Sequence, residues 1–220
     1  MPTPVTVQEG GAGTQAWYGF SDWPPVDSRS LQLNLTAAGT LSDTSGNSST
    51  ANYNVPANAQ STAVPPVCGP VICDIAPVPT VPVPSDQKLV FDSVIFANDV
   101  VLSGRPTFHL KSSISATDTI FVVAISDVAP DGSAKQIQTS PAYFKTSHRD
   151  SHKFLSKIVP GELNEYNFPG YHNLYRIVKG HKLRVEIRGS DSGLHESAPA
   201  GNVVIATGQG GSFIKLQVRQ

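Results

Sequence analysis

The chain has 220 residues, with 16 Lys and Arg against 17 Asp and Glu, and this near balance argues against a nucleic-acid or anionic-membrane partner held by bulk charge. Charged residues make up 15% of the chain, below the roughly 25% of an average soluble domain, while the 18 Gly and 18 Pro exceed average usage. This profile favours a loop-rich all-β protein, and the length fits one β-sandwich or two small domains.

Residues 1–30 predict an extended entry segment. Glycines interrupt it, and the consecutive Pro24 and Pro25 forbid a helix at its end. Four aromatic side chains gather here: Trp17, Tyr18, Phe20 and Trp23. Three roles are open to such rings. Most commonly they fill the core of their own domain; alternatively they stack on a sugar or pack against a neighbouring domain. We therefore take them as the candidate docking or ligand surface.

No export or membrane segment is predicted. The first residues have neither a basic start nor an apolar stretch, and no run approaches the roughly 18 consecutive apolar residues of a membrane span. The low charge, the many Ser and Thr and a close cysteine pair nevertheless lean toward a secreted or periplasmic protein.

The next stretch predicts one strand and then a long insertion. Residues 31–35 alternate apolar and polar, and a turn at Gly39 leads into a Ser/Thr/Asn-rich loop. Eight prolines lie from Pro56 to Pro84, so residues 56–84 are expected to run as an extended insertion. Inside it, Cys68 and Cys73 form either a small local disulfide or two free thiols, and a disulfide would imply an oxidising compartment.

Strand patterns are dense over residues 86–220, the expected main sandwich. Residues 119–125 are apolar on both faces, which predicts a central strand in which Phe121 is a core residue. In the alternating strand at residues 182–188, Lys182 is expected to point toward solvent. A Pro-Asp-Gly turn at residues 130–132 predicts a hairpin, and residues 148–158 predict at most a short helix. Strands are expected at residues 88–91, 100–102, 105–111, 119–125, 134–138, 142–146, 182–188, 202–206 and 214–219.

These elements predict a single domain over residues 1–220 with an all-β fold. No internal period of 20 to 50 residues is visible, which removes propellers and solenoids. Strands follow one another without amphipathic helices between them, which removes Rossmann, TIM-barrel and complete α/β-hydrolase folds. A mainly antiparallel jelly-roll β-sandwich of the galactose-binding-like type remains.

Motifs for a nucleophile or a phosphate site are incomplete. The string nearest to the Gly-x-Ser-x-Gly turn of serine hydrolases spans residues 189–193 and has Asp191 where serine is required. The glycine-rich residues 208–212 lack the lysine of a phosphate-binding loop and lead into a strand. We therefore predict no catalytic and no cofactor-binding residue.

The titratable residues likewise predict no metal site. His148 and His152 have metal-ligand spacing only if they lie on a helix, and no glutamate stands between them as in zinc proteases. Three aspartates flank the central hairpin without the regular spacing of a calcium loop, so turn chemistry is expected of Asp118, Asp127 and Asp131. Two other histidines are expected as surface or satisfied edge groups, namely His109 and His181.

The order of several landmarks resembles the carboxy-terminal domain of serine hydrolases of the X-prolyl dipeptidyl-peptidase, cocaine esterase and α-amino-acid ester hydrolase type. The likeness covers nearly the whole chain and rests on the succession of motifs, since none alone is specific. The landmarks are Trp23-Pro24-Pro25, Ala38-Gly39-Thr40-Leu41, residues 86–93 (DQKLVFDS), residues 99–106 (DVVLSGRP), Asp118, residues 126–132 (SDVAPDG), residues 159–162 (VPGE), residues 179–185 (KGHKLRV) and the strand at residues 214–218.

The resemblance implies a jelly-roll module appended to an α/β-hydrolase domain that works by a Ser-His-Asp mechanism. None of the matched positions is a nucleophile, base or orienting acid of that family. We therefore expect a non-catalytic module, from a cut or shortened chain, that packs on the catalytic domain, helps to shape the active-site rim and supports oligomer contacts. An independent carbohydrate- or ligand-binding module, and an enzyme of unexpected type, remain as alternatives.

Overall fold

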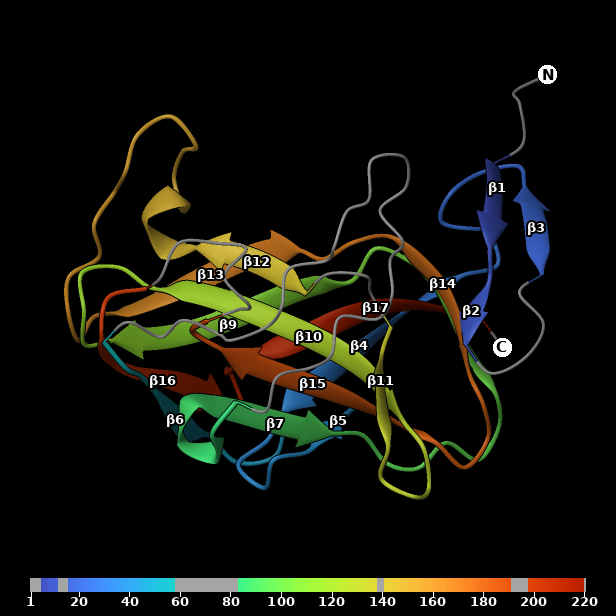
Figure 1. Ribbon diagram of the computed structural model, residues 1–220, viewed down its shortest axis with the longest axis horizontal. Coiled ribbons are helices and arrows are strands. Elements are labelled where there is room, and N and C mark those ends of the chain that lie inside the picture. Colours follow the sequence, from blue (N-terminus) through green and yellow to red (C-terminus); the bar gives the residue numbers. More distant parts are fainter. Residues whose placement is uncertain (1–4, 12–15, 58–82, 138–140, 191–197, 220) are drawn as a thin grey trace, which may run out of the picture.

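A computed structural model describes residues 5–11, 16–57, 83–137, 141–190 and 198–219 (Figure 1). In these residues no helix is long or apolar enough to cross a membrane. The elements are β1 (Val5–Gln8), β2 (Gly10–Gly11), β3 (Trp17–Phe20), β4 (Arg29–Leu35), β5 (Leu41–Ser42), β6 (Ser49–Val55), η1 (Ser85–Gln87), β7 (Lys88–Asp92), β8 (Val100–Gly104), β9 (Thr107–Ile114), β10 (Ile120–Val128), β11 (Ala134–Gln136), β12 (Ala142–Lys145), η2 (Thr146–His148), β13 (Leu163–Pro169), β14 (Asn173–Ile177), β15 (Lys182–Arg188), β16 (Gly201–Thr207) and β17 (Phe213–Arg219).

Two large sheets pack face to face. The larger follows the order β2-β14-β8-β17-β9-β16-β6, with β13 paired to β9, β4 to β17 and β5 to β4. The smaller follows β11-β10-β15-β7, and β12 also pairs with β10. Among the described strand ladders only the one between β2 and β14 is parallel. The expected all-β, mainly antiparallel jelly-roll sandwich is confirmed, while its assignment as one domain over residues 1–220 stays a prediction.

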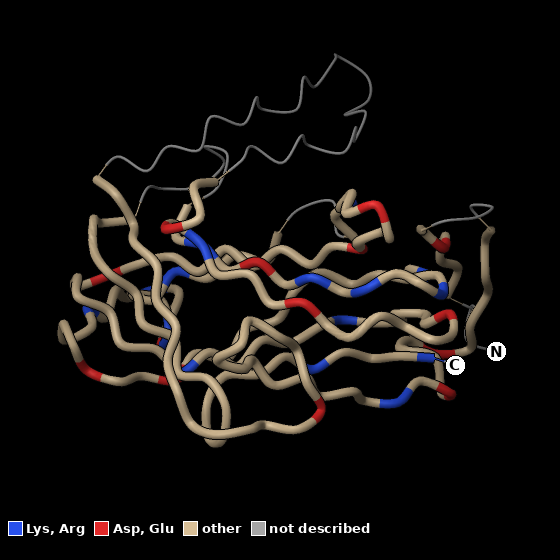
Figure 2. The backbone as a smooth tube through the Cα atoms, turned by 90° about the horizontal axis from the view of Figure 1, so that it is seen from below, with Lys and Arg blue, Asp and Glu red and all other residues tan. Residues whose placement is uncertain are grey.

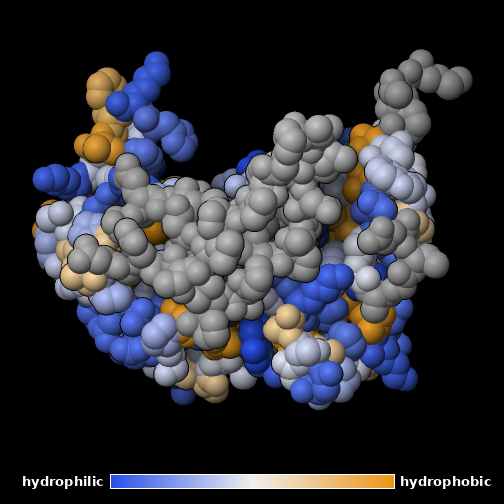
Figure 3. All heavy atoms as spheres, in the orientation of Figure 1, coloured by the Kyte–Doolittle hydropathy of each residue, from blue (hydrophilic) through white to orange (hydrophobic). Residues whose placement is uncertain are grey.

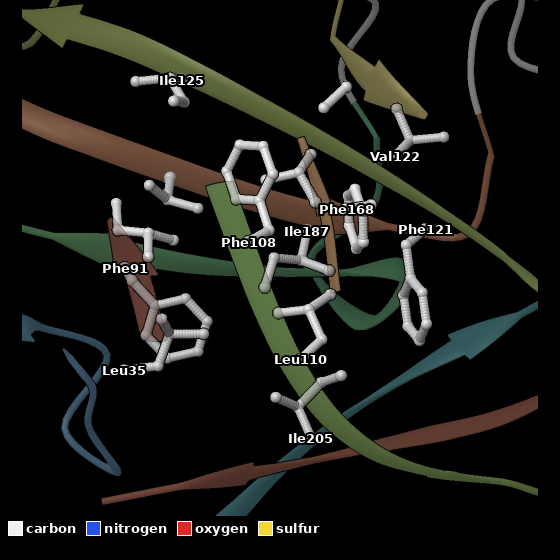
Figure 4. Close-up of a cluster of buried hydrophobic side chains, with 14 of the residues drawn as sticks. Leu35, Phe91, Phe108, Leu110, Phe121, Val122, Ile125, Phe168, Ile187 and Ile205 are labelled. Atoms are coloured by element: carbon white, nitrogen blue, oxygen red, sulfur yellow. The ribbon is translucent and has the colours of Figure 1, made fainter. Parts of the chain in front are cut away.

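The core lies between the two sheets and centres on β10. Eight of the nine residues of β10 are buried, and the strand pairs with β15 on one side and with β11 and β12 on the other. The Phe121 ring of β10 lies 5.2 Å from the Tyr166 ring and 6.4 Å from the Phe168 ring, both on β13 of the opposite sheet (Figure 4). The prediction that this strand is central is therefore confirmed, and Phe121 links the two layers.

All nine strands expected in the main sandwich form, with small shifts of their ends. In β9 the side chains of Phe108 and Leu110 are buried while those of Thr107, His109 and Lys111 face outward, as the alternation predicts. The Pro-Asp-Gly turn joins β10 to β11 in an antiparallel hairpin.

Three strands of five or more residues were not predicted from the sequence, namely β6, β13 and β14. The sequence of β6, STANYNV, reads as a polar loop by composition, yet Tyr53 and Val55 face the core while the polar residues face solvent. Among the described strands, β6 lies at the edge of the larger sheet and pairs only with β16. Its outer side faces solvent, as one face of an antiparallel sheet commonly does, and so tolerates the Ser, Thr and Asn that hid the pattern.

The segment after β12 is not an α-helix. A single 3-10 turn, η2, is followed by an irregular loop up to β13. The Arg149 side chain donates hydrogen bonds to the carbonyl oxygens of Ser156 and Lys157. Since these contacts fold the chain back on itself, the helical spacing of Phe154, Leu155 and Ile158 is not used.

Candidate docking surface

The two-stranded sheet of β1 and β3 stands outside both main sheets (Figure 1). Its strands are antiparallel, with Gln8 opposite Trp17. Strand β2 joins it to the sandwich by pairing with β14. At Gly11 the backbone has φ +111°, and a Cβ atom there would lie 2.2 Å from the carbonyl oxygen of Arg176. Only glycine permits this close approach, so β2 fixes where the β1–β3 sheet leaves the sandwich.

The four predicted aromatic residues lie together but do not face one way. Because side chains alternate along a strand, Tyr18 and Phe20 share one face of β3 and Trp17 takes the other. The rings of Tyr18 and Phe20 stack at 6.4 Å, and the Phe20 ring lies 5.6 Å from that of Trp23. Trp17 is 66% exposed, and none of the four belongs to the buried core. The reading in which these rings plug the core is therefore wrong.

Trp23 is held in place by a residue far away in the chain. Its indole N–H lies 3.0 Å from Nδ1 of His172, which accepts the hydrogen bond, and the two rings are 6.5 Å apart. His172 lies between β13 and β14, a region in which the sequence reading found no site residue. The row of rings thus runs from β3 onto the body of the sandwich.

Two arginines anchor the aromatic row. The Arg176 guanidinium makes a bidentate ion pair with Glu9, with N–O distances of 3.0 and 3.1 Å. The hydrogen bond to Glu9 raises the pKa of Arg176. Arg219 lies over the Phe20 ring, 5.1 Å from its centroid, and its guanidinium pairs with Asp27.

A groove of about 440 Å³ opens between the β1–β3 sheet and the sandwich. It is lined by Glu9, Tyr18, Gly19, Phe20, Val101, Arg176 and Arg219. Both arginines in it are already paired with carboxylates, so the groove offers mixed polar and aromatic walls and no spare charge of one sign. Figure 2 shows the same interspersed pattern of acidic and basic residues along the described strands.

A second polar cluster lies where β10 ends and β15 begins, and it contains Asp127, which is inside β10 and not in the turn that the sequence predicted for it. The buried Asp127 carboxylate pairs with Nδ1 of His181 at 2.7 Å and accepts a hydrogen bond from the Tyr175 hydroxyl at 3.2 Å. Burial, with the nearby Asp127 carboxylate, raises the pKa of Tyr175. These three residues line a cavity of about 370 Å³ whose rim includes Ser133 and Lys135. The prediction that His181 is a satisfied edge group agrees with this pairing.

The other candidate residues hold turns or lie outside the described residues. Asp118 accepts hydrogen bonds from the Thr146 hydroxyl and the Ser147 N–H of η2, and Asp131 closes the hairpin turn by accepting hydrogen bonds from Ser133. The His148 and His152 rings are 5.9 Å apart, and no group of three metal-ligating side chains gathers in the described ranges. Three predictions concern residues that lie wholly or mostly beyond those ranges: the extended insertion at residues 56–84, the pairing of Cys68 with Cys73, and the loop around Asp191.

A third polar cluster lies on the outer face of β7 and β15. The Asp92 carboxylate accepts two hydrogen bonds from Arg184, at 2.7 and 2.8 Å, and one from Lys182 at 2.6 Å. The Arg184 bond, with help from Lys182, lowers the pKa of Asp92. Lys182 is indeed on the solvent-facing side of its strand, yet it is ion-paired.

Replacing Asp92 with asparagine is expected to cost about 1–2 kcal/mol at pH 6, because a charge-assisted hydrogen-bond set is lost. The pKa is lower in the folded than in the unfolded chain, so the contribution is complete above the unfolded value of about 3.9 and is lost as the pH falls through the folded value. Urea unfolding of both proteins from pH 7 to pH 3 tests this. The control Lys182→Ala, which keeps Arg184 on Asp92, should cost less than about 1 kcal/mol. A loss in Asp92→Asn that is the same at pH 3 and pH 6 would contradict the assignment.

Comparisons with known proteins give one family and one fold. A family model described as the X-Pro dipeptidyl-peptidase C-terminal non-catalytic domain matches residues 2–205. A search of curated proteins finds no match.

Three solved structures share the fold. An aminopeptidase from a marine sediment archaeon, Thaumarchaeota archaeon, is 20% identical with a TM-score of 0.74, and the match covers 100% of this chain and 41% of that one. A CocE/NonD family hydrolase from Staphylococcus aureus is 16% identical with a TM-score of 0.73, covering 98% and 41%. An α-amino acid ester hydrolase is 20% identical with a TM-score of 0.75, covering 99% and 41%. The chain thus spans about two fifths of the length of these relatives.

Proposed function

Because the chain belongs to the family of X-Pro dipeptidyl-peptidase C-terminal non-catalytic domains, we propose that it packs on an α/β-hydrolase catalytic domain, in the same polypeptide or as a separate chain. The relatives are named as an aminopeptidase and as hydrolases, and each extends well beyond the part that this chain matches. We assign the partner to the class of hydrolase domains on that basis. By this packing the module would also help to shape the active-site rim and support contacts between subunits.

The single observation that carries the docking proposal is the exposed aromatic strand β3. Trp17 is 66% exposed on a sheet that stands outside the sandwich. Large exposed rings on a rigid support are costly to hydrate and are enriched in interfaces, where tryptophan often dominates the binding energy. The paired arginines and Gly11 hold this strand in position before a partner arrives, which lowers the entropy cost of docking.

The chain's tryptophans make a direct test possible. The sequence contains two tryptophans, Trp17 and Trp23, so the chain's own tryptophan emission, after subtraction of the emission of the hydrolase domain alone, reports on the proposed surface. The partner is the hydrolase domain of the α-amino acid ester hydrolase, prepared without its own C-terminal domain and shown to hydrolyse an ester. Adding it should shift the emission to the blue and protect Trp17 from acrylamide quenching.

Replacing Trp17 with alanine should weaken the association about tenfold or more. The Kd is measured by calorimetry, with Leu163→Ala as the matched control, because Leu163 is also an exposed apolar residue on a strand but lies on β13. If Trp17→Ala and Leu163→Ala bind with the unchanged Kd, or if the emission stays constant, β3 is not the docking strand.

A second candidate function is binding of a carbohydrate in the groove beside Phe20. The observation that favours it is the groove of about 440 Å³ with aromatic and charged walls. Sugars stack on aromatic faces and hydrogen-bond to paired Arg and carboxylate groups. In this case soluble oligosaccharides alone, without a hydrolase domain, would change the tryptophan emission.

A further inference from the structure

We infer that residues 147–156 form a second docking element, a preorganised loop that inserts Phe154 and Leu155 into an apolar, acid-rimmed pocket of the same hydrolase domain. The inference rests on the proposed function, since it names a second contact with that partner. The loop follows η2 and lies far along the chain from β3.

The neck of this loop is closed by backbone hydrogen bonds. The Ser156 N–H donates to the Ser147 carbonyl at 2.8 Å, so the two ends meet and the ten residues form a compact Ω-loop. The Ile158 N–H donates to the Thr117 carbonyl at 3.0 Å, and the Ile158 side chain is buried in the core. The loop therefore leaves the sandwich at a fixed place.

Two charged side chains stiffen the neck further. One oxygen of Asp118 accepts hydrogen bonds from the Thr119 N–H, the Thr146 hydroxyl and the Ser147 N–H, at 2.7–2.9 Å. Arg149 spans the inside of the loop and donates to the carbonyl oxygens of Ser156 and Lys157. A loop held by this many internal contacts loses little conformational entropy when it binds.

The tip presents apolar side chains to solvent. Phe154 is 74% exposed and Leu155 is 65% exposed, and Val159 just beyond the neck is exposed as well. Nothing in the described residues packs on them. Figure 3 shows apolar and hydrophilic side chains side by side on the loop that rises at the left of the molecule. A rigid loop with an exposed apolar tip is suited to insertion into a complementary cavity of a partner.

The charge around the tip defines the partner surface. Lys153 and Lys157 flank the two apolar residues and are exposed, and among the described residues neither forms an ion pair. The acidic residue of the loop, Asp150, lies 3.7 Å from Nε of Arg149. Apolar side chains between two ammonium groups suit a hydrophobic pocket with Asp or Glu at its rim, because such a rim pairs with both lysines. A fully apolar or a basic pocket would leave the positive charges of both lysines without a partner.

The position of the loop makes the hydrolase domain its occupant. The β1–β3 sheet and the 147–156 loop rise from the same long side of the sandwich, at opposite ends (Figure 1). One body large enough to cover that side contacts both, and the solved relatives carry more than half of their length outside the region matched here. Two separate contacts with one partner fix its orientation as well as its affinity.

The test uses the titration with the ester hydrolase domain described above. The double variant Phe154→Ser/Leu155→Ser should raise the Kd about ten- to a hundredfold, while at saturation the protection of Trp17 remains. The matched control is Val94→Ser/Ile95→Ser, which removes an equally exposed apolar pair from the loop between β7 and β8. Thermal unfolding of both variants should match the parent, since the replaced side chains are exposed.

Charge reversal supplies an independent measurement. Lys153→Glu/Lys157→Glu should slow association and reverse its dependence on salt, because the new carboxylates repel an acidic rim and added salt screens this repulsion. If the parent chain does not bind the hydrolase domain at all, the proposed function itself fails. If the parent binds and the Phe154→Ser/Leu155→Ser variant binds equally well, only the second docking element is overturned. If instead the parent binds vesicles of phosphatidylcholine and phosphatidylserine and the variant does not, with an unchanged Kd for the hydrolase domain, the loop is a lipid contact and the inference is wrong.

Discussion

Replacing Phe121 with alanine is expected to lower the free energy of unfolding by about 3–5 kcal/mol. Phe121 is fully buried on the central strand β10, and its ring contacts Tyr166 and Phe168 across the sandwich. Truncation removes the transfer energy of a large ring and leaves a cavity that two opposed sheets cannot easily close. Chemical denaturation gives the free energy, and calorimetry should show a fall in melting temperature of about 2–4 °C per kcal/mol for a domain of this size.

The control for this prediction is the same substitution on the surface. Phe154→Ala removes an identical ring from a side chain that is 74% exposed, so its effect should stay within about 0.5 kcal/mol. Equal losses for the two variants would mean that the sandwich faces are placed wrongly.

Replacing Gly208 with alanine should cost roughly 2–5 kcal/mol. Gly208 begins the turn between β16 and β17 with φ +75°, and a Cβ there would lie 1.8 Å from the Asn47 carbonyl oxygen. The cost combines the left-handed conformation, about 1–2 kcal/mol, with overpacking against backbone, about 1–3 kcal/mol. The turn cannot move away easily, because the Gly208 N–H donates to the Leu35 carbonyl at 2.8 Å.

Gly210 separates these two contributions. It lies in the same turn with φ +68°, but no atom lies within 4 Å of the position of its Cβ. Gly210→Ala should therefore cost only the conformational part, about 1–2 kcal/mol. Guanidinium unfolding of the two variants gives the difference directly, and a Gly210→Ala loss as large as that of Gly208→Ala would contradict the close packing on Asn47.

The strands that the sequence predicts well are those whose own order of apolar and polar residues shows which side chains are buried. In β9, β15 and β17 apolar and polar residues alternate, and β10 begins with a continuous apolar run over residues 120–125, so each pattern indicates which faces are buried without knowledge of the partner strand. Strand β6 carries no such signal, because Tyr53 and Val55 are its only buried residues and the other five are small or polar. Its pairing with β16 joins residues about 150 positions apart.

The candidate docking surface, too, is predicted only in part from the sequence. The sequence identifies Trp17, Tyr18, Phe20 and Trp23 as a group, but it does not reveal that Trp17 faces away from Tyr18 and Phe20, nor that His172 holds Trp23. Nor does it predict the exposed tip at Phe154, because that segment has helix-compatible spacing and its true shape depends on Arg149 reaching carbonyl groups. Side-chain contacts of this kind, unlike periodicity, leave no local pattern.

Several motifs that served only as landmarks of resemblance meet in space. Asp127 of one landmark pairs with His181 of another, and Asp92 pairs with Lys182 and Arg184 of that same landmark. Their shared role is to tie β7, β10 and β15 together at the ends and on the outer face of the smaller sheet. The order of these motifs along the chain was therefore a better guide to the family than any of them was to a catalytic site.

The place of β17 in the larger sheet also sets when the protein is able to fold during synthesis. This strand pairs with β4, β8 and β9, so it fills the middle of the sheet although it holds residues 213–219. Until those residues leave the ribosome, three strands made earlier display unpaired edges, which other nascent chains can join. A nascent chain that stalls shortly before β17 would therefore expose the unpaired edges of β4, β8 and β9 to other chains.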